Sequence, residues 1–159
     1  MNTIKKLFPV LYLLPMLMLS QTAMAGDDDI KVIEMDGTNQ LQFTVTEIVA
    51  RPGQTVKVIL TTVSDFPKIA MAHNFVLLKA KADAAAVAAA SARASDNEYI
   101  APEMEDQILA YTGMAGGGET VEVTFTVPET PGTYEYICTF PGHYAGGMKG
   151  TLVVKKQAA

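Results

Sequence analysis

The most informative stretch of the sequence reads CTFPGHYAGGM, from Cys138 to Met148. It holds a thiol, the imidazole of His143 and a thioether within one short segment that is rich in turn residues. Proline and glycine at 141–142 favour a chain reversal that returns His143 toward the sulfur. The two glycines at 146–147 permit a second reversal that brings Met148 into reach. The spacing therefore predicts a loop between two strands that gathers three potential metal ligands.

The residues before this loop indicate that its sulfur faces the protein interior. Tyr134, Tyr136 and Cys138 alternate along a strand-like segment, so their side chains point to one side of it. His73, the only other histidine in the chain, begins another apolar segment. Two imidazoles, one thiolate and a weak thioether ligand are the donor set of a blue-copper site. Sulfur stabilises Cu(I) and imidazole suits Cu(II), so this set favours a copper ion that changes oxidation state.

Each of these four residues also has a simpler explanation. A single cysteine is most often a small buried apolar side chain, and the histidines and the methionine could be ordinary core or loop residues. Cys138 could also be a nucleophile with His143 as its base, but a core-facing thiol without an evident oxyanion hole disfavours this. A binuclear copper centre needs a second thiolate, and methionine is a weak ligand for zinc. The loop spacing and the unpaired thiol together favour a metal site.

The first 25 residues have the order of a secretory signal peptide. Two lysines precede an apolar run over residues 7–19, and the small residues Ala-Met-Ala end at Ala25. The run is shorter than the roughly 20 residues of a membrane-spanning helix. We therefore expect residues 1–25 to be cleaved and residues 26–159 to form one exported, periplasmic domain. With one cysteine, that domain cannot form an internal disulfide, so Cys138 is left for burial, pairing between chains, reaction or metal binding.

Short strand-like segments separated by glycine and proline recur along the expected domain. The alternation of apolar and polar residues is clearest over 121–127. Other strand-like segments are residues 30–35, 41–45, 54–63, 73–79, 133–138 and 150–155. Residues 82–94 differ, because they are dense in alanine and predict a helical insertion. Many short strands and one helix predict an all-β, antiparallel sandwich.

Two segments closely resemble azurins, a group of blue-copper proteins. They are the copper loop with the following Met148-Lys149-Gly150-Thr151-Leu152, and Ala72-His73-Asn74-Phe75-Val76-Leu77. The resemblance covers essentially the whole expected domain. It implies a Greek-key cupredoxin sandwich of about eight strands, with one helical insertion and one type 1 copper at one end. The implied ligands are His73, Cys138, His143 and Met148, with a weak axial contribution from the carbonyl of Ala72. It further implies that the backbone N–H groups of Asn74 and Phe140 donate to the thiolate.

The sequence also departs from the azurin pattern. Four residues separate His143 from Met148, one more than azurins usually have, as in auracyanins and plastocyanins. Ala72 replaces the usual glycine before the first histidine, Phe75 replaces the core tryptophan, and the usual azurin disulfide is absent. These changes leave the ligand set intact. They affect the axial distances, the reduction potential and the stability, and they make the ligand loop auracyanin-like.

The resemblance implies a periplasmic electron carrier that shuttles single electrons between redox partners. Those partners would be proteins such as cytochromes, reductases or oxidases, which dock transiently around His143, where the neighbouring residues 144–147 carry no charge. The alternative is a protein that stores or delivers copper. We expect neither enzymatic activity nor a small-molecule substrate. The formal net charge of −5 and the lack of basic clusters along the sequence disfavour nucleic-acid binding.

Overall fold

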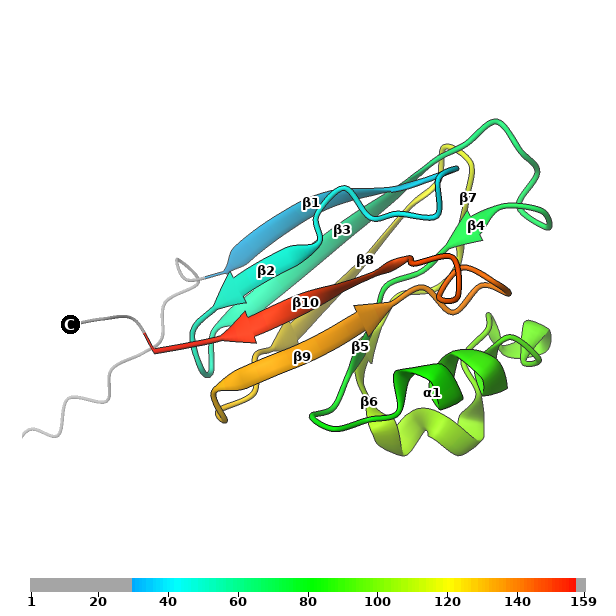
Figure 1. The fold of residues 1–159 in the computed structure, drawn as a ribbon. Helices are drawn as coiled ribbons and strands as arrows, with labels where there is room; N and C mark the ends of the chain where they lie inside the picture. The colour runs from blue at the N-terminus through cyan, green and yellow to red at the C-terminus, as the bar shows by residue number, and fades with distance from the viewer. Residues whose placement is uncertain (1–29, 157–159) are drawn as a thin grey trace, which may run out of the picture.

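Two β-sheets form most of the structure, with a helical segment at one side (Figure 1). The computed structural model describes residues 30–156, so the predicted signal peptide, residues 1–25, lies outside the described residues. The first sheet has the order β1-β3-β8 and consists of β1 (Lys31–Thr38), β3 (Thr55–Val63) and β8 (Thr120–Thr126). The second has the order β2-β10-β9-β5-β6 and consists of β2 (Glu47–Ala50), β10 (Lys149–Val154), β9 (Gly132–Ile137), β5 (Val76–Leu78) and β6 (Ile108–Tyr111).

A third, two-stranded sheet pairs β4 (Ala72–His73) with β7 (Ala115–Gly116). The described residues thus contain ten strands, of which these two have only two residues each. The remaining strands match the predicted sandwich of about eight. All-β architecture with one short helix is confirmed.

The core lies between the two main sheets. Val56, Val58 and Leu60 of β3 are buried while the residues between them are partly exposed, as expected for a strand with one face on the core. They share one apolar cluster with Tyr136 and Leu152 of the second sheet. The same cluster includes the cysteine and the methionine of the ligand loop, so the site is continuous with the core.

Two pairs of strands are parallel, although the sequence predicted an antiparallel sandwich. β1 pairs with β3, and β2 pairs with β10, in the parallel sense, whereas the other pairings are antiparallel. The chain leaves β1 in the first sheet and enters β2 in the second, so each of these strands lies at an edge beside a strand from later in the sequence. Such long-range pairings do not appear in local sequence patterns.

Two predicted strands differ from those observed. Residues 41–45 do not form a strand, because the chain turns sharply there and only Phe43 makes a single bridge to Gly37. The predicted strand over 73–79 is interrupted between β4 and β5, where the chain passes from the small sheet to the second main sheet. The residues at this interruption, Asn74 and Phe75, are fully buried.

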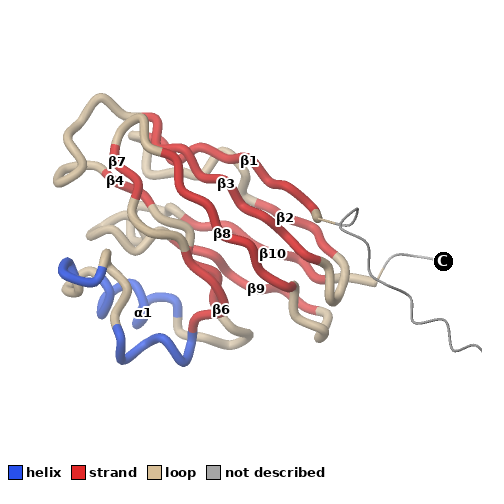
Figure 2. The backbone as a smooth tube through the Cα atoms, turned by 180° about the vertical axis from the view of Figure 1, so that it is seen from behind, coloured by secondary structure: helices blue, strands red, loops and turns tan. Residues whose placement is uncertain are grey.

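The predicted helical insertion is present but shorter than expected. Helix α1 (Ala84–Ser91) begins after Asp83, whose carboxylate accepts a hydrogen bond from the Ala86 N–H at 3.0 Å. Two 3₁₀ turns follow, η2 (Ser95–Asn97) and η3 (Pro102–Gln107), and the helical segments gather at one side of the sheets (Figure 2). Val87 of the helix packs in a second apolar cluster with residues of β5 and β9. No helix of residues 30–156 is long and apolar enough to span a membrane.

Candidate metal centre

The predicted ligands meet at one end of the sandwich, where β9 ends and β10 begins (Figure 1). Cys138 directly follows β9 and Met148 directly precedes β10, so the ladder between these strands places both at the same end. His73 comes from β4, and His143 lies in the loop between the two strands. His73, Cys138 and Met148 have no exposed surface, whereas His143 retains 4 % exposure. The site is therefore closed to solvent except beside His143.

Three donor atoms converge in this site. The Nδ1 atoms of His73 and His143 are 3.2 Å apart. The Sγ atom of Cys138 lies 3.5 Å from Nδ1 of His143 and 3.9 Å from Nδ1 of His73. Metal bonds to histidine nitrogen and cysteine sulfur of about 2.0–2.3 Å, as in zinc sites, place three trigonal donors about 3.6–3.8 Å apart. The observed triangle thus has the size needed to surround one metal ion.

Backbone hydrogen bonds close the ligand loop on itself. The Cys138 N–H donates to the Met148 carbonyl at 3.2 Å, and the Met148 N–H donates to the His143 carbonyl at 3.0 Å. Gly142 and Gly147 have positive φ angles of 84° and 99°, which glycine adopts without strain. The two predicted reversals of the chain are confirmed. They fix the backbone of His143 and Met148 relative to the cysteine.

A buried hydrogen-bond network, which the sequence interpretation missed, joins the two segments that carry the ligands. The Asn74 side chain donates from Nδ2 to Thr139 Oγ1 at 2.8 Å, and the Thr139 N–H donates back to Asn74 Oδ1 at 2.9 Å. The Thr139 hydroxyl donates in turn to the Tyr99 carbonyl at 2.6 Å. Asn74 and Thr139 each follow a candidate ligand in the sequence, and that position is the one signal that could have identified them.

Burial determines the protonation of the three donors. Desolvation lowers the pKa of His73 and of His143 to about 4, with the neighbouring His143 contributing to the shift of His73. Both imidazoles are therefore neutral at pH 7 and able to bind a metal. Desolvation raises the pKa of Cys138 to about 12, although hydrogen bonds from the backbone of Asn74 and Phe140 oppose the shift. The predicted donation by these two N–H groups is confirmed.

The raised pKa of Cys138 favours metal binding over nucleophilic catalysis. A buried cysteine that holds its proton at neutral pH is a poor nucleophile. A bound metal ion would supply the positive charge that stabilises the Cys138 thiolate in this apolar site, with release of the thiol proton. The site therefore fits a metal better than it fits a covalent intermediate.

The far side of the His73 ring faces the end of β1. Within the described residues, Nε2 of His73 is the buried side-chain nitrogen or oxygen that lacks a hydrogen bond of good geometry. The backbone carbonyl of Thr38 is nonetheless close enough to raise the histidine's pKa against the effect of burial. Nδ1 of His73 faces the Cys138 sulfur and Nδ1 of His143, so it is the ring nitrogen available to a metal.

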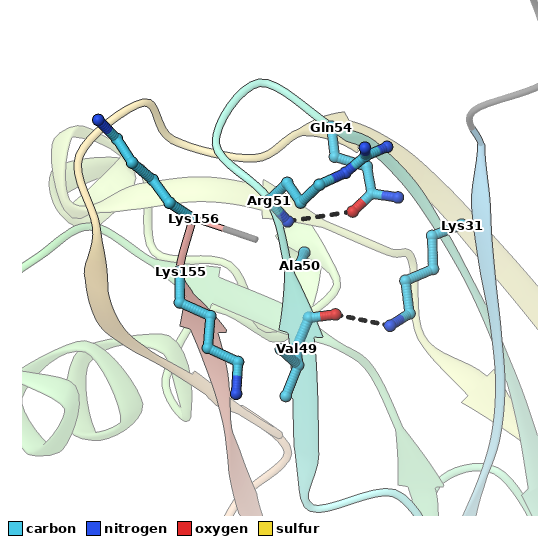
Figure 3. A pocket seen from close by; sticks show the side chains of 7 residues that line it. All are labelled: Lys31, Val49, Ala50, Arg51, Gln54, Lys155 and Lys156. Atoms are coloured by element: carbon cyan, nitrogen blue, oxygen red, sulfur yellow. Dashed lines mark hydrogen bonds between the residues drawn. The ribbon is translucent and has the colours of Figure 1, made fainter. Parts of the chain in front are cut away.

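A surface hollow lies at the opposite end of β10, away from the donors (Figure 3). Four cationic residues line it, namely Lys31, Arg51, Lys155 and Lys156. The Lys31 ammonium donates to the Val49 carbonyl at 2.6 Å, which bridges the edge strands β1 and β2. These cations come from separate parts of the sequence, so the sequence pattern alone does not indicate that they lie together. None of the candidate ligands lines this hollow.

The donor atoms at the ligand-loop end of the sandwich indicate which metal the site prefers. Two imidazoles and a thiolate in a trigonal arrangement, next to a buried methionine, suit copper better than the hard cations that prefer oxygen ligands. The fold and the site together define a cupredoxin, a β-sandwich protein that holds one copper ion beneath a loop at one end.

Comparison with known proteins supports this class. Residues 30–155 match the sequence profile of the copper binding proteins of the plastocyanin/azurin family. Auracyanin-A of Chloroflexus aurantiacus is 42 % identical over 116 residues, which are 72 % of this chain and 68 % of that protein. An azurin of Pseudomonas chlororaphis is 39 % identical over 127 residues, which are 77 % of this chain and 97 % of that one. The chain belongs to the plastocyanin/azurin family of copper binding proteins.

Relatives of the auracyanin type are prominent among the similar proteins. Auracyanin-B of Chloroflexus aurantiacus is 51 % identical over 83 residues, 52 % of this chain, but the match spans only 35 % of that protein. The solved structure of auracyanin A, a "blue" copper protein, has a TM-score of 0.70 and 40 % identity and covers 79 % of this chain and 99 % of that one. Reduced auracyanin of Roseiflexus castenholzii has a TM-score of 0.68 at 34 % identity, with coverages of 79 % and 98 %.

Proposed function

We propose that this protein is a blue-copper electron carrier in which His73, Cys138 and His143 would hold the copper ion. Met148 would supply a weak thioether ligand, and the carbonyl of Ala72 would make a further weak contribution. The single observation that carries the proposal is the convergence of one sulfur and two Nδ1 atoms, 3.2–3.9 Å apart, in a buried site. The blue copper named for the solved auracyanin A supports the same assignment.

Copper in such a site cycles between its two oxidation states, and the protein's part is to keep the surroundings unchanged. The loop hydrogen bonds and the network of Asn74 and Thr139 hold the donors in place. The apolar cluster around Cys138 and Met148 excludes water. A rigid, dry site needs little rearrangement when the charge of the metal changes, which permits fast transfer of an electron.

His143 is the proposed exit for electrons. It is the one candidate ligand with exposed surface, and the residues beside it in the loop, Pro141 and Gly142, are exposed and uncharged. An uncharged rim suits the brief contacts of small area that are typical of redox encounters. We propose that a cytochrome, reductase or oxidase docks there.

The absorption spectrum after addition of Cu(II) tests the assignment. We expect an intense visible band that ascorbate bleaches and an oxidant restores, since a thiolate bound to Cu(II) gives strong colour. Cys138→Ser should bind copper weakly and lose the band, and strong colour in that variant would overturn the ligand assignment. Rapid, reversible exchange with a cytochrome separates a carrier from a copper store, whereas transfer of the metal itself to an apo-protein would favour the store.

We further propose that residues 1–25 direct export and are removed, so that residues 26–159 function in the periplasm. The order of charged, apolar and small residues at the N-terminus supports this. Mass spectrometry of the protein released from the periplasm of an expressing cell should give a chain that begins at Gly26. A full-length chain in the cytoplasmic fraction would contradict the proposal.

A further inference from the structure

The connection between β1 and β2 packs against the metal centre from outside the ligand loop. It turns sharply, with the Leu41 N–H donating to the Thr38 carbonyl at 3.0 Å and the Thr38 N–H donating to the Gln42 carbonyl at 3.0 Å. The Thr44 N–H donates to the Asp36 carbonyl, also at 3.0 Å, and closes a small hairpin. This hairpin, residues 36–44, contains no candidate ligand, and the proposed function gives it no role.

Gly37 is the point where the hairpin meets the ring of His73. A methyl group on its α-carbon would lie 2.6 Å from Cδ2 and 2.7 Å from Cγ of that ring. Real side-chain carbons do not approach so closely, and the ring is fully buried, so it has little room to retreat. The φ angle of Gly37 is not in the left-handed region. A glycine is therefore required here by the ring and not by the backbone conformation.

Leu41 is the point where the hairpin meets the ligand loop. Its φ angle is +56°, a left-handed conformation that is unfavourable for a bulky side chain and normal for glycine or asparagine. Its Cδ1 atom lies 2.6 Å from the position that a methyl group on Gly146 would take. The leucine side chain thus covers the bare backbone of Gly146, and this contact explains why a leucine is present where the turn alone would favour a smaller residue.

We propose that hairpin 36–44 is a positioning element of the metal centre, in which Gly37 sets the ring of His73 and Leu41 holds the ligand loop at Gly146. One rigid segment then fixes the spacing between the ligand on β4 and the ligands on the loop. The inference rests on the proposed ligand assignment, but its tests use the metal-free protein as well as the copper form. Failure of the hairpin proposal is thereby distinguishable from failure of the copper assignment.

A double-mutant cycle tests the Gly37 contact without copper. Gly37→Ala is made in the wild-type chain and in His73→Ala, and urea unfolding of the four metal-free proteins is compared. We expect Gly37→Ala to lower the midpoint more when the imidazole is present than in His73→Ala, where only the Cβ atom of residue 73, 2.9 Å from the added methyl group, remains in close contact. An equal loss in both backgrounds would overturn the role of the ring contact, because the added methyl group would then disturb β1 itself.

Copper competition with a chelator adds a second readout for Gly37. Replacing groups that orient metal ligands typically weakens binding by roughly 10–100-fold, and we expect a loss in this range for Gly37→Ala. The matched control is Glu34→Ala, at an exposed position of β1 outside the hairpin, where strand alternation directs the side chain to the face opposite Gly37. Equal affinities of Gly37→Ala and the wild type would overturn the proposal for this residue.

Amide hydrogen exchange tests the Leu41 contact. The N–H groups of Gly146 and Met148 donate within the ligand loop at 2.9 and 3.0 Å and report its opening. Leu41→Ala should accelerate their exchange by about 10-fold, and the amide of Thr151 in β10 should keep its wild-type rate. Leu109→Ala, at an exposed leucine of β6 outside the hairpin, is the control. Unchanged exchange at both loop amides in Leu41→Ala would overturn the clamp.

Discussion

Replacing Asn74 with alanine removes the side chain that joins the two ligand-bearing segments, and the structure gives the size of the effect. The variant leaves the buried Thr139 N–H without its acceptor, 2.9 Å away in the wild type. An unsatisfied buried donor costs about 1–3 kcal/mol, and the lost bond to Thr139 Oγ1 adds about 1 kcal/mol. The hydroxyl keeps its bond to the Tyr99 carbonyl, which limits the damage. We therefore expect a loss of about 2–4 kcal/mol in the free energy of unfolding.

Urea unfolding of the metal-free protein, followed by circular dichroism, measures this loss. With an m-value of about 2 kcal/mol per M, in the range that small domains show, the midpoint should fall by roughly 1–2 M. The matched control is Thr61→Val, which removes a side-chain hydrogen bond of 2.9 Å to Thr120 at the exposed face of β3 and β8. That change should cost less than about 0.5 kcal/mol, because water replaces the lost partner.

The comparison of the two variants decides whether burial gives the network its importance. Equal midpoint shifts for Asn74→Ala and Thr61→Val would refute the reasoning, since both changes remove a side-chain hydrogen bond of similar length. A loss confined to Asn74→Ala would confirm that the buried network contributes to stability. The same variant should also release copper faster, because the segment after Cys138 is then no longer tied to the segment after His73.

Met148→Leu should keep copper and colour but shift the reduction potential in voltammetry, since an axial thioether tunes the metal; an unchanged potential would place Met148 outside the ligand set. The metal-free protein should lose stability as the pH falls from 6.5 toward 4. The pKa values of His73 and His143 are lowered to about 4 in the folded state, so the unfolded chain takes up protons first. His143→Gln should reduce this pH dependence of the urea midpoint, and an unaltered profile would contradict the assignment. Gly150→Ala should cost about 1–3 kcal/mol through overlap with the Tyr136 ring, and the cost should shrink in a Tyr136→Ala background.

The metal site could be predicted from sequence because its donors have distinctive chemistry. Three of the four predicted ligands lie within eleven consecutive residues, and the reversals that gather them depend on glycines whose positive φ angles the structure confirms. His73 could be paired with them by elimination, as the only other histidine. The strand before Cys138 could be predicted from the alternation of apolar residues alone. Local patterns therefore sufficed for these parts.

Features that depend on long-range contacts could not be predicted in this way. Residues 41–45 read as a strand because they alternate, yet Leu41 adopts a left-handed conformation that a contact with Gly146 explains. Gly37 looks like an ordinary strand glycine until the ring of His73 is placed beside it. The bond pattern of Asn74 requires knowledge that Thr139 is its neighbour. In each case a partner distant in sequence determines the local structure.

The hydrogen bond between the Cys138 N–H and the Met148 carbonyl separates the paired strands β9 and β10 from the ligand loop. These two parts differ in how well they tolerate insertions and deletions. On one side, the strands β9 and β10 continue as a regular ladder. On the other side, the ligand loop leaves the sheet after Cys138 and returns at Met148. The length of this loop does not affect the register of the sheet. Insertions or deletions between His143 and Met148 can therefore occur without changing the pairing of β9 with β10. Changes in this loop can therefore alter the surroundings of the metal and the docking surface while the sandwich keeps its structure.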